Sequence, residues 1–258
     1  MLNGMSKVVF FFQSLDPYAV KEALPAAEVS VVHTKARCAD YIIENPDVDG
    51  IFLQRDALGQ EHRRFMESVK LHFPLITVGL ISPVRPEPML EDCVLIVHAR
   101  MPEIIGREIG LILADAARRE KRASVRYDWP LKGRLIRPGE PNGAADGMPC
   151  RVRSLSSGGA FLETGNAALK EKDPIRLGIE FLNQRCALDA VVVSLRPAGA
   201  RTKSGCGVRF NMPPQAAVDL FERVVRDALM QALLNPDEEV KPPALDDQDL
   251  LIPGFESA

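Results

Sequence analysis

The chain has 258 residues, of which 46% are hydrophobic, so its apolar content suffices for two modest cores and we expect two domains. Its formal net charge is −3, which argues against a general nucleic-acid binder because sequence-independent phosphate binding requires a basic surface. The five cysteines show no CxxC or Cys/His spacing, so we expect no metal site and reduced thiols in a cytoplasmic protein. No run approaches the roughly 20 apolar residues of a membrane helix, so no membrane insertion is expected.

The first part of the chain alternates short apolar strands with helices. The expected strands lie at residues 7–12, 28–33, 48–53, 75–81 and 93–98. The expected helices lie at residues 16–24, 36–44, 59–73 and from 102 onward. This alternation indicates a parallel sheet with helices on both faces, so we predict an α/β domain over residues 1–117.

A second type of pattern follows an abrupt change to Arg and Lys between Ala117 and Tyr127, which we interpret as a hinge. Short strands without helices between them are expected at residues 131–136, 152–155, 159–163, 174–182, 187–195 and 207–210. They predict a small antiparallel barrel, followed by a helix from Pro213 to Leu234. The acidic segment 235–258 is expected to be a disordered tail.

The segment Cys150 to Thr164, CRVRSLSSGGAFLET, places apolar residues around a Ser-Ser-Gly-Gly centre. This composition predicts a strand, a sharp bend and a second strand. The hydroxyls of Ser154 and Ser156 and the backbone near Gly159 would gather at the bend, where a polar ligand can approach closely. Serine-glycine bends are usually only turns, so the segment requires a second signal.

That signal is the spacing Arg122-Ala-Ser-Val-Arg126, which precedes the first expected barrel strand. The two motifs together resemble the PilZ family of cyclic di-GMP receptors, whose signature is RxxxR followed by (D/N)xSxxG. Ser156 and Gly159 match the second motif, whereas Ser154 replaces its Asp or Asn. The segment AVVVSLRPAGARTKSGCGVRFNMPP also resembles the closing strands and terminal helix start of that family.

The resemblance implies an all-β PilZ-like barrel with a C-terminal helix over residues 118–234, with cyclic di-GMP as its ligand. Guanidinium groups suit this ligand because they can pair with phosphate or with the guanine edge and can stack on a base. Ser154 offers a shorter, uncharged acceptor than a carboxylate, which predicts weaker binding. The implied ligand-binding residues are Arg118, as an alternative first arginine, with Arg122, Arg126, Ser154, Ser156 and Gly159.

The five strands of the N-terminal domain resemble the receiver domain of response regulators, a flavodoxin-like fold. A receiver requires an acidic pair, a phosphoacceptor Asp and a Lys at its strand ends, where this chain has FFFQS, IFLQRD and IVHARMP. Gln54 occupies the phosphoacceptor position, and Asp56 lies two residues late. Without a carboxylate cluster there is little to hold the cation that phosphoryl transfer requires, which predicts a pseudo-receiver.

Together these features predict a cytoplasmic signalling receptor that binds cyclic di-GMP and changes its domain arrangement to regulate an unidentified protein partner. The alternative is a degenerate PilZ adaptor that binds proteins without the nucleotide, and Ser154 is the main argument for it. No catalytic constellation is found, so the protein is not predicted to be an enzyme. No cofactor, metal or nucleic acid is expected, and a homo-oligomer stays an open alternative.

Overall fold

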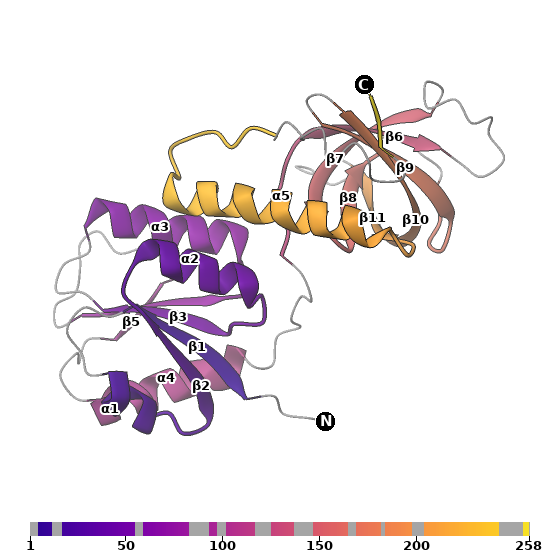
Figure 1. Ribbon diagram of the computed structural model, residues 1–258. Helices are drawn as coiled ribbons and strands as arrows, with labels where there is room; N and C mark the ends of the chain where they lie inside the picture. The colour runs from indigo at the N-terminus through magenta and orange to yellow at the C-terminus, as the bar shows by residue number, and fades with distance from the viewer. Residues whose placement is uncertain are drawn as a thin grey trace. The chain divides into compact units, whose positions relative to one another are not determined.

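The computed structural model of the protein (Figure 1) divides into two compact units. The first comprises Met1–Ala123 and Leu229–Glu239, and the second comprises Ser124–Ala228 and Val240–Ala258. The predicted domain boundaries after residues 117 and 234 stay predictions. The structure describes residues 5–11, 17–54, 59–82, 93–96, 102–116, 125–136, 147–164, 169–181, 184–197, 204–242 and 255–257.

The first unit contains a five-stranded parallel sheet in the order β2-β1-β3-β4-β5. This is the flavodoxin-like strand order, so the predicted receiver-like α/β fold is confirmed. Figure 1 shows α2 and α3 on one face of the sheet and α1 and α4 on the other. The elements are β1 (Ser6–Phe11), α1 (Pro17–Glu22), β2 (Ala27–Val32), α2 (Lys35–Glu44), β3 (Gly50–Gln54), α3 (Gln60–His72), β4 (Thr77–Ile81), β5 (Val94–Ile96) and α4 (Pro102–Ala116).

The core of this unit lies on both faces of its central strands. Residues 8–11 of β1 are each at most 3% exposed, as expected for a parallel strand covered on both sides. The rings of Phe10 and Phe52 lie 5.7 Å apart between centroids. Phe52 also fills the space beside Gly79, where an added Cβ would lie 2.4 Å from the ring. Ile105 and Ile109 of α4, both fully buried, complete this cluster.

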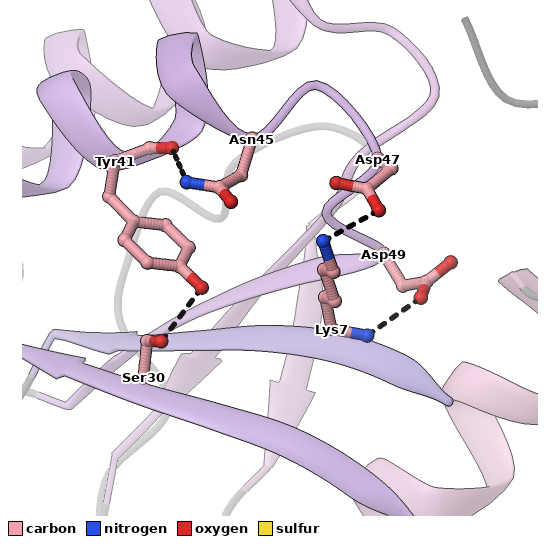
Figure 2. Close-up of polar contacts among 6 residues, drawn as sticks. All are labelled: Lys7, Ser30, Tyr41, Asn45, Asp47 and Asp49. Atoms are coloured by element: carbon pink, nitrogen blue, oxygen red, sulfur yellow. Dashed lines mark hydrogen bonds and ion pairs between the residues drawn. The ribbon is translucent and has the colours of Figure 1, made fainter. Parts of the chain in front are cut away.

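Polar contacts join the start of β1 to the start of β3, as Figure 2 shows. The backbone N–H of Lys7 donates to Oδ2 of Asp49 at 2.9 Å, and the backbone N–H of Asp49 donates to the Lys7 carbonyl at 2.8 Å. Nζ of Lys7 lies 2.8 Å from Oδ2 of Asp47. Nearby, the Ser30 hydroxyl on β2 donates to the Tyr41 hydroxyl on α2 at 2.7 Å. These contacts fix the strand ends opposite the edge where a receiver has its acidic residues.

The second unit is a closed antiparallel barrel. Six strands follow one another in the order β11-β8-β7-β6-β9-β10, and a further pairing between β10 and β11 closes the circle. This confirms the predicted all-β barrel, which removes open sheet edges by closure. The strands are β6 (Leu131–Ile136), β7 (Met148–Ser156), β8 (Gly159–Glu163), β9 (Pro174–Glu180), β10 (Gln184–Arg196) and β11 (Gly205–Phe210).

A long helix, α5 (Gln215–Leu234), follows the barrel, as the sequence predicted. Its residues up to 228 belong to the second unit, where the Phe221 ring packs 5.7 Å from Phe210 and 6.3 Å from Phe181. Phe221 is fully buried, so the first half of the helix contributes to the barrel core.

The disordered tail predicted for residues 235–258 stays a prediction, and the described residues of this segment make two contacts. Asp237 forms an ion pair with Arg64 of α3 within the first unit. Farther along, β12 (Phe255–Ser257) pairs with residues 184–186 of β10 in the second unit. The sequence does not predict this strand, because its backbone hydrogen bonds depend on residues 184–186 of β10, which lie beyond the part of β10 that pairs with β11.

Candidate ligand-binding site

The hairpin between β7 and β8 holds two residues of the predicted second motif. Ser156 and Gly159 form the last register pair before the turn, and the Ser156 hydroxyl donates to the Gly159 carbonyl at 3.1 Å. Gly159 approaches β11 so closely that an added Cβ would lie 2.1 Å from the Val208 carbonyl oxygen. Both residues therefore shape the hairpin, besides any contact with a ligand.

A β-bulge in β7 determines which way the two serines point. The register shifts between the pairs Val152–Leu162 and Ser154–Phe161, which leaves Arg153 as the extra residue. Without the extra residue, strict alternation would place Ser154 on the same side as the buried Val152. With it, Leu155 points into the barrel at 0% exposure, and Ser154 lies on the outer side at 8% exposure.

The end of the basic segment lies directly beside this hairpin. Tyr127 forms an isolated bridge with Leu155, in which each backbone N–H donates to the other residue's carbonyl at 3.1 and 3.0 Å. Arg126, which precedes Tyr127, is exposed. The structure thus brings Arg126 of the first motif next to Ser154 and Ser156 of the second. Arg118 and Arg122 lie outside the described residues.

Tyr127 is a site residue that the sequence analysis did not identify. It acts through its backbone, and its ring packs edge-on against Trp129 with centroids 4.7 Å apart. Trp129 is 2% exposed, and its indole N–H has no hydrogen-bond partner in the described part of the chain. The sequence does contain a signal for this bridge. Tyr127 and Trp129 follow RxxxR directly, and aromatic side chains favour strand pairing.

The surface around the hairpin carries several cations interleaved with carboxylates. A row of directly opposite residues crosses four strands in the order Glu180, Lys132, Arg151, Glu163. Nε of Arg153 also lies 3.7 Å from Oε1 of Glu163. Guanidinium groups beside the hairpin suit a ligand with phosphates, because their fixed charge and planar donors match phosphate geometry.

Metal-ligating clusters and reactive thiols are two kinds of chemistry that the described residues do not show. No group of three or more His, Cys, Asp or Glu within the described ranges could hold a metal ion. All five cysteines are free, and burial raises the pKa of Cys150 to about 12 and that of Cys206 to about 11, so these thiols are protonated at neutral pH. No helix in the described part of the chain is long and apolar enough to cross a membrane.

The carboxyl edge of the α/β sheet has uncharged residues where a receiver has acids. β3 ends at Gln54, which is 6% exposed, and β4 is followed by Ser82, which is 2% exposed. At the end of β1, the Phe11 ring stacks on His62 of α3 with centroids 5.7 Å apart. Asp56, the carboxylate that lies two residues after the phosphoacceptor position, is outside the described residues.

These features define the second unit as a small closed barrel with a polar hairpin on its outer surface and an arginine beside it. Residues 118–227 match the family model described as the PilZ domain. The match confirms the resemblance noted in the sequence. No curated protein matches the chain.

Several solved structures are similar to parts of the chain. The Bacillus subtilis inhibitor of motility MotI/DgrA shares 13% identity and a TM-score of 0.36, covering 42% of this chain and 50% of that chain. Escherichia coli YcgR in complex with c-di-GMP shares 17% identity and a TM-score of 0.37, covering 45% and 49%. A response regulator from Thermotoga maritima shares 15% identity and a TM-score of 0.36, covering 43% and 98%. The chain spans about half the length of the MotI/DgrA and YcgR structures.

Proposed function

We propose that the protein is a cytoplasmic receptor that binds cyclic di-GMP at the β7–β8 hairpin and regulates a protein partner. The main support is the backbone bridge between Tyr127 and Leu155, because it holds Arg126 beside Ser154 and Ser156. The match of residues 118–227 to the PilZ domain model supports this ligand class, and YcgR, one of the similar structures, is a complex with c-di-GMP. The proposed binding residues are Arg118 or Arg122, with Arg126, Ser154, Ser156 and Gly159.

The chemistry of a cyclic dinucleotide explains why these residues would have different roles in binding. Its two phosphates and two purine bases require planar cations, which Arg122 and Arg126 supply. Ser154 offers a hydroxyl acceptor to the polar hydrogens of a guanine edge. The Ser156 hydroxyl already donates its hydrogen to Gly159, so toward a ligand it can only accept.

Binding would regulate the partner through the hinge. The proposed arginines lie in residues 118–126, where the chain first passes from one unit to the other, so holding them on a nucleotide restricts one of the connections between the units. A ligand that binds one domain arrangement more tightly shifts the population toward it, by an amount that its differential affinity limits. We propose a receptor that changes its domain arrangement rather than an enzyme.

The absence of an Asp or Asn at Ser154 favours the alternative, an adaptor that binds a protein partner without the nucleotide.

Calorimetric titration of the full chain with cyclic di-GMP tests the proposal. We expect saturable binding, and we expect Arg126→Ala to weaken it about ten- to a hundredfold, because a hydrogen bond to a charged group contributes about 1.5–3 kcal/mol. Arg176→Ala is the matched control, since Arg176 is an exposed arginine on β9, separated from β7 by β6. Ser154→Asp is expected to tighten binding, because it restores the charged acceptor of the family motif.

The outcome separates the two candidate functions. A folded protein that shows no heat of binding up to high micromolar nucleotide would overturn the receptor proposal and favour the adaptor. Equal weakening by Arg126→Ala and Arg176→Ala would show that general surface charge, rather than this site, attracts the ligand.

A further inference from the structure

A row of small side chains extends from Ser154 across the outer surface of the barrel. Ser154 on β7 pairs with Phe161 on β8, Phe161 pairs with Gly207 on β11, and Gly207 pairs with Ser194 on β10. Directly opposite residues of an antiparallel sheet point to the same face. Phe161 is therefore the one large side chain in a row that is otherwise serine and glycine.

Phe161 points outward and is half-buried. Its neighbours on β8, Ala160 and Leu162, are 3% and 0% exposed and fill the barrel interior. The Phe161 ring instead lies over the backbone of β11, where a Cβ added at Gly205 would lie 2.8 Å from its Cζ atom. Glycine at position 205 thus gives the ring a flat backbone surface to rest on.

An arginine from a third strand covers this ring. Arg196 on β10 pairs with Gly205, and its guanidinium carbon lies 4.4 Å from the centroid of the Phe161 ring. This distance is within the range of a cation–π contact. Arg196 is exposed, so the planar guanidinium carries accessible surface on the outer side of the barrel.

We propose that Phe161 and Arg196 form a stacking platform that holds the face of a purine base of the bound nucleotide. This inference rests on the proposed function, because the platform adjoins Ser154 through the Ser154–Phe161 pair. Aromatic rings and guanidinium planes both stack on bases, whatever the base. The platform supplies affinity for purines in general, and the edge contacts of Ser154 and Arg126 supply selectivity for guanine.

Titration of cyclic di-GMP into Phe161→Ala and Arg196→Lys tests the platform. Phe161→Ala removes the ring that supports the guanidinium plane of Arg196, and loss of this stacking surface is expected to weaken binding by roughly five- to a hundredfold, since base stacking contributes about 1–3 kcal/mol per base. Arg196→Lys keeps the charge but lacks the plane, so it is also expected to weaken binding. Arg176→Lys is the matched control and is expected to bind as the wild type does.

If Phe161→Ala lowers the melting temperature, its loss of binding could come from unfolding. Phe161→Leu and Phe161→Trp then provide the test. Leucine preserves an apolar cover over Gly205 without a ring, so it is expected to weaken binding at an unchanged melting temperature. Tryptophan keeps a ring beneath Arg196, so binding is expected to persist, and a base held on the platform is expected to quench the fluorescence of this tryptophan. Wild-type protein, whose only tryptophan is the buried Trp129, provides the baseline.

The results distinguish this inference from the proposed function. Wild type that binds cyclic di-GMP, with Phe161→Leu and Arg196→Lys binding equally well, overturns the platform and leaves the receptor intact. Wild type that does not bind overturns the receptor, and the platform with it. Weakened binding of both variants, with quenching in Phe161→Trp, supports the platform.

Discussion

Gly159 shows how one residue serves both the hairpin and the proposed site. An added Cβ would lie 2.1 Å from the carbonyl oxygen of Val208, a backbone atom that cannot move without disturbing β11. Gly158, the preceding residue, has no atom within 4 Å of its added Cβ. The glycine of the motif is thus required by strand packing, independently of any ligand.

We predict that Gly159→Ala lowers the free energy of unfolding by about 1–3 kcal/mol, the usual cost of overpacking. Gly158→Ala is expected to change it by less than about 0.5 kcal/mol, as surface substitutions usually do. Denaturant unfolding followed by the fluorescence of Trp129 measures both values in the barrel itself. Equal stability of the two variants would mean that β8 and β11 separate more easily than their hydrogen bonds suggest.

Arg126, Ser154, Ser156 and Gly159 could be selected from the sequence because their chemistry and spacing match a known motif. The outward direction of Ser154 could not, because it depends on the bulge at Arg153, and alternation alone would have placed the serine inside. The contact between Phe161 and Arg196 could not be predicted from the sequence either, because it joins residues of β8 and β10, which are separated by β11.

Two polar contacts at the start of β1 are expected to contribute unequally to the stability of the α/β unit. Asp49 is 3% exposed and accepts a hydrogen bond from the backbone of Lys7, whereas the ion pair of Lys7 with Asp47 is partly exposed to solvent. The hydrogen bond with Asp47 raises the pKa of Lys7. The stabilisation from that pair is therefore fully present below the ordinary lysine pKa and is lost as the pH rises through the raised one.

We predict that Asp49→Ala lowers the free energy of unfolding of the α/β unit by about 1.5–3 kcal/mol, the contribution of a hydrogen bond to a charged group. Asp47→Ala is expected to cost at most about 1 kcal/mol, because solvent screens an exposed pair. Thermal unfolding followed by circular dichroism at neutral pH compares them. Asp49→Asn keeps an acceptor for the Lys7 N–H and is expected to recover part of the loss; failure to do so would locate the effect in the charge.

At the level of whole elements, hydrophobic patterning predicted the strands and helices of both units well. Apolar runs such as residues 7–12 and 48–53 define strands because burial on both faces favours continuous Val, Ile and Phe. Patterning does not predict which strands pair across long stretches of chain. The closure of β10 onto β11 and the pairing of β12 with β10 are such cases, since they depend on backbone edges rather than on side chains.

At the level of the whole molecule, residues 118–126 combine the proposed ligand-binding arginines with one of the places where the chain passes between the units. The other two lie within α5 and after Glu239. A bound nucleotide would fix Arg122 and Arg126 to the hairpin, whose position is already set by the Tyr127–Leu155 bridge. Ordering a segment on binding costs conformational entropy, so part of the ligand's interaction energy would be used to restrict the hinge.

We predict that cyclic di-GMP slows amide hydrogen exchange in residues 118–126 and changes the radius of gyration of the full chain. Exchange reports the ordering of the hinge, because restricted backbone opens less often to solvent. Small-angle scattering reports the domain arrangement, and a coupling of about 1–3 kcal/mol between ligand and arrangement would shift the population enough to be seen. Arg126→Ala with the same amount of nucleotide is the control, and both changes should be reduced in it. If cyclic di-GMP binds while exchange and dimensions stay constant, the hinge does not transmit the signal, and the partner must instead contact the liganded surface of the barrel.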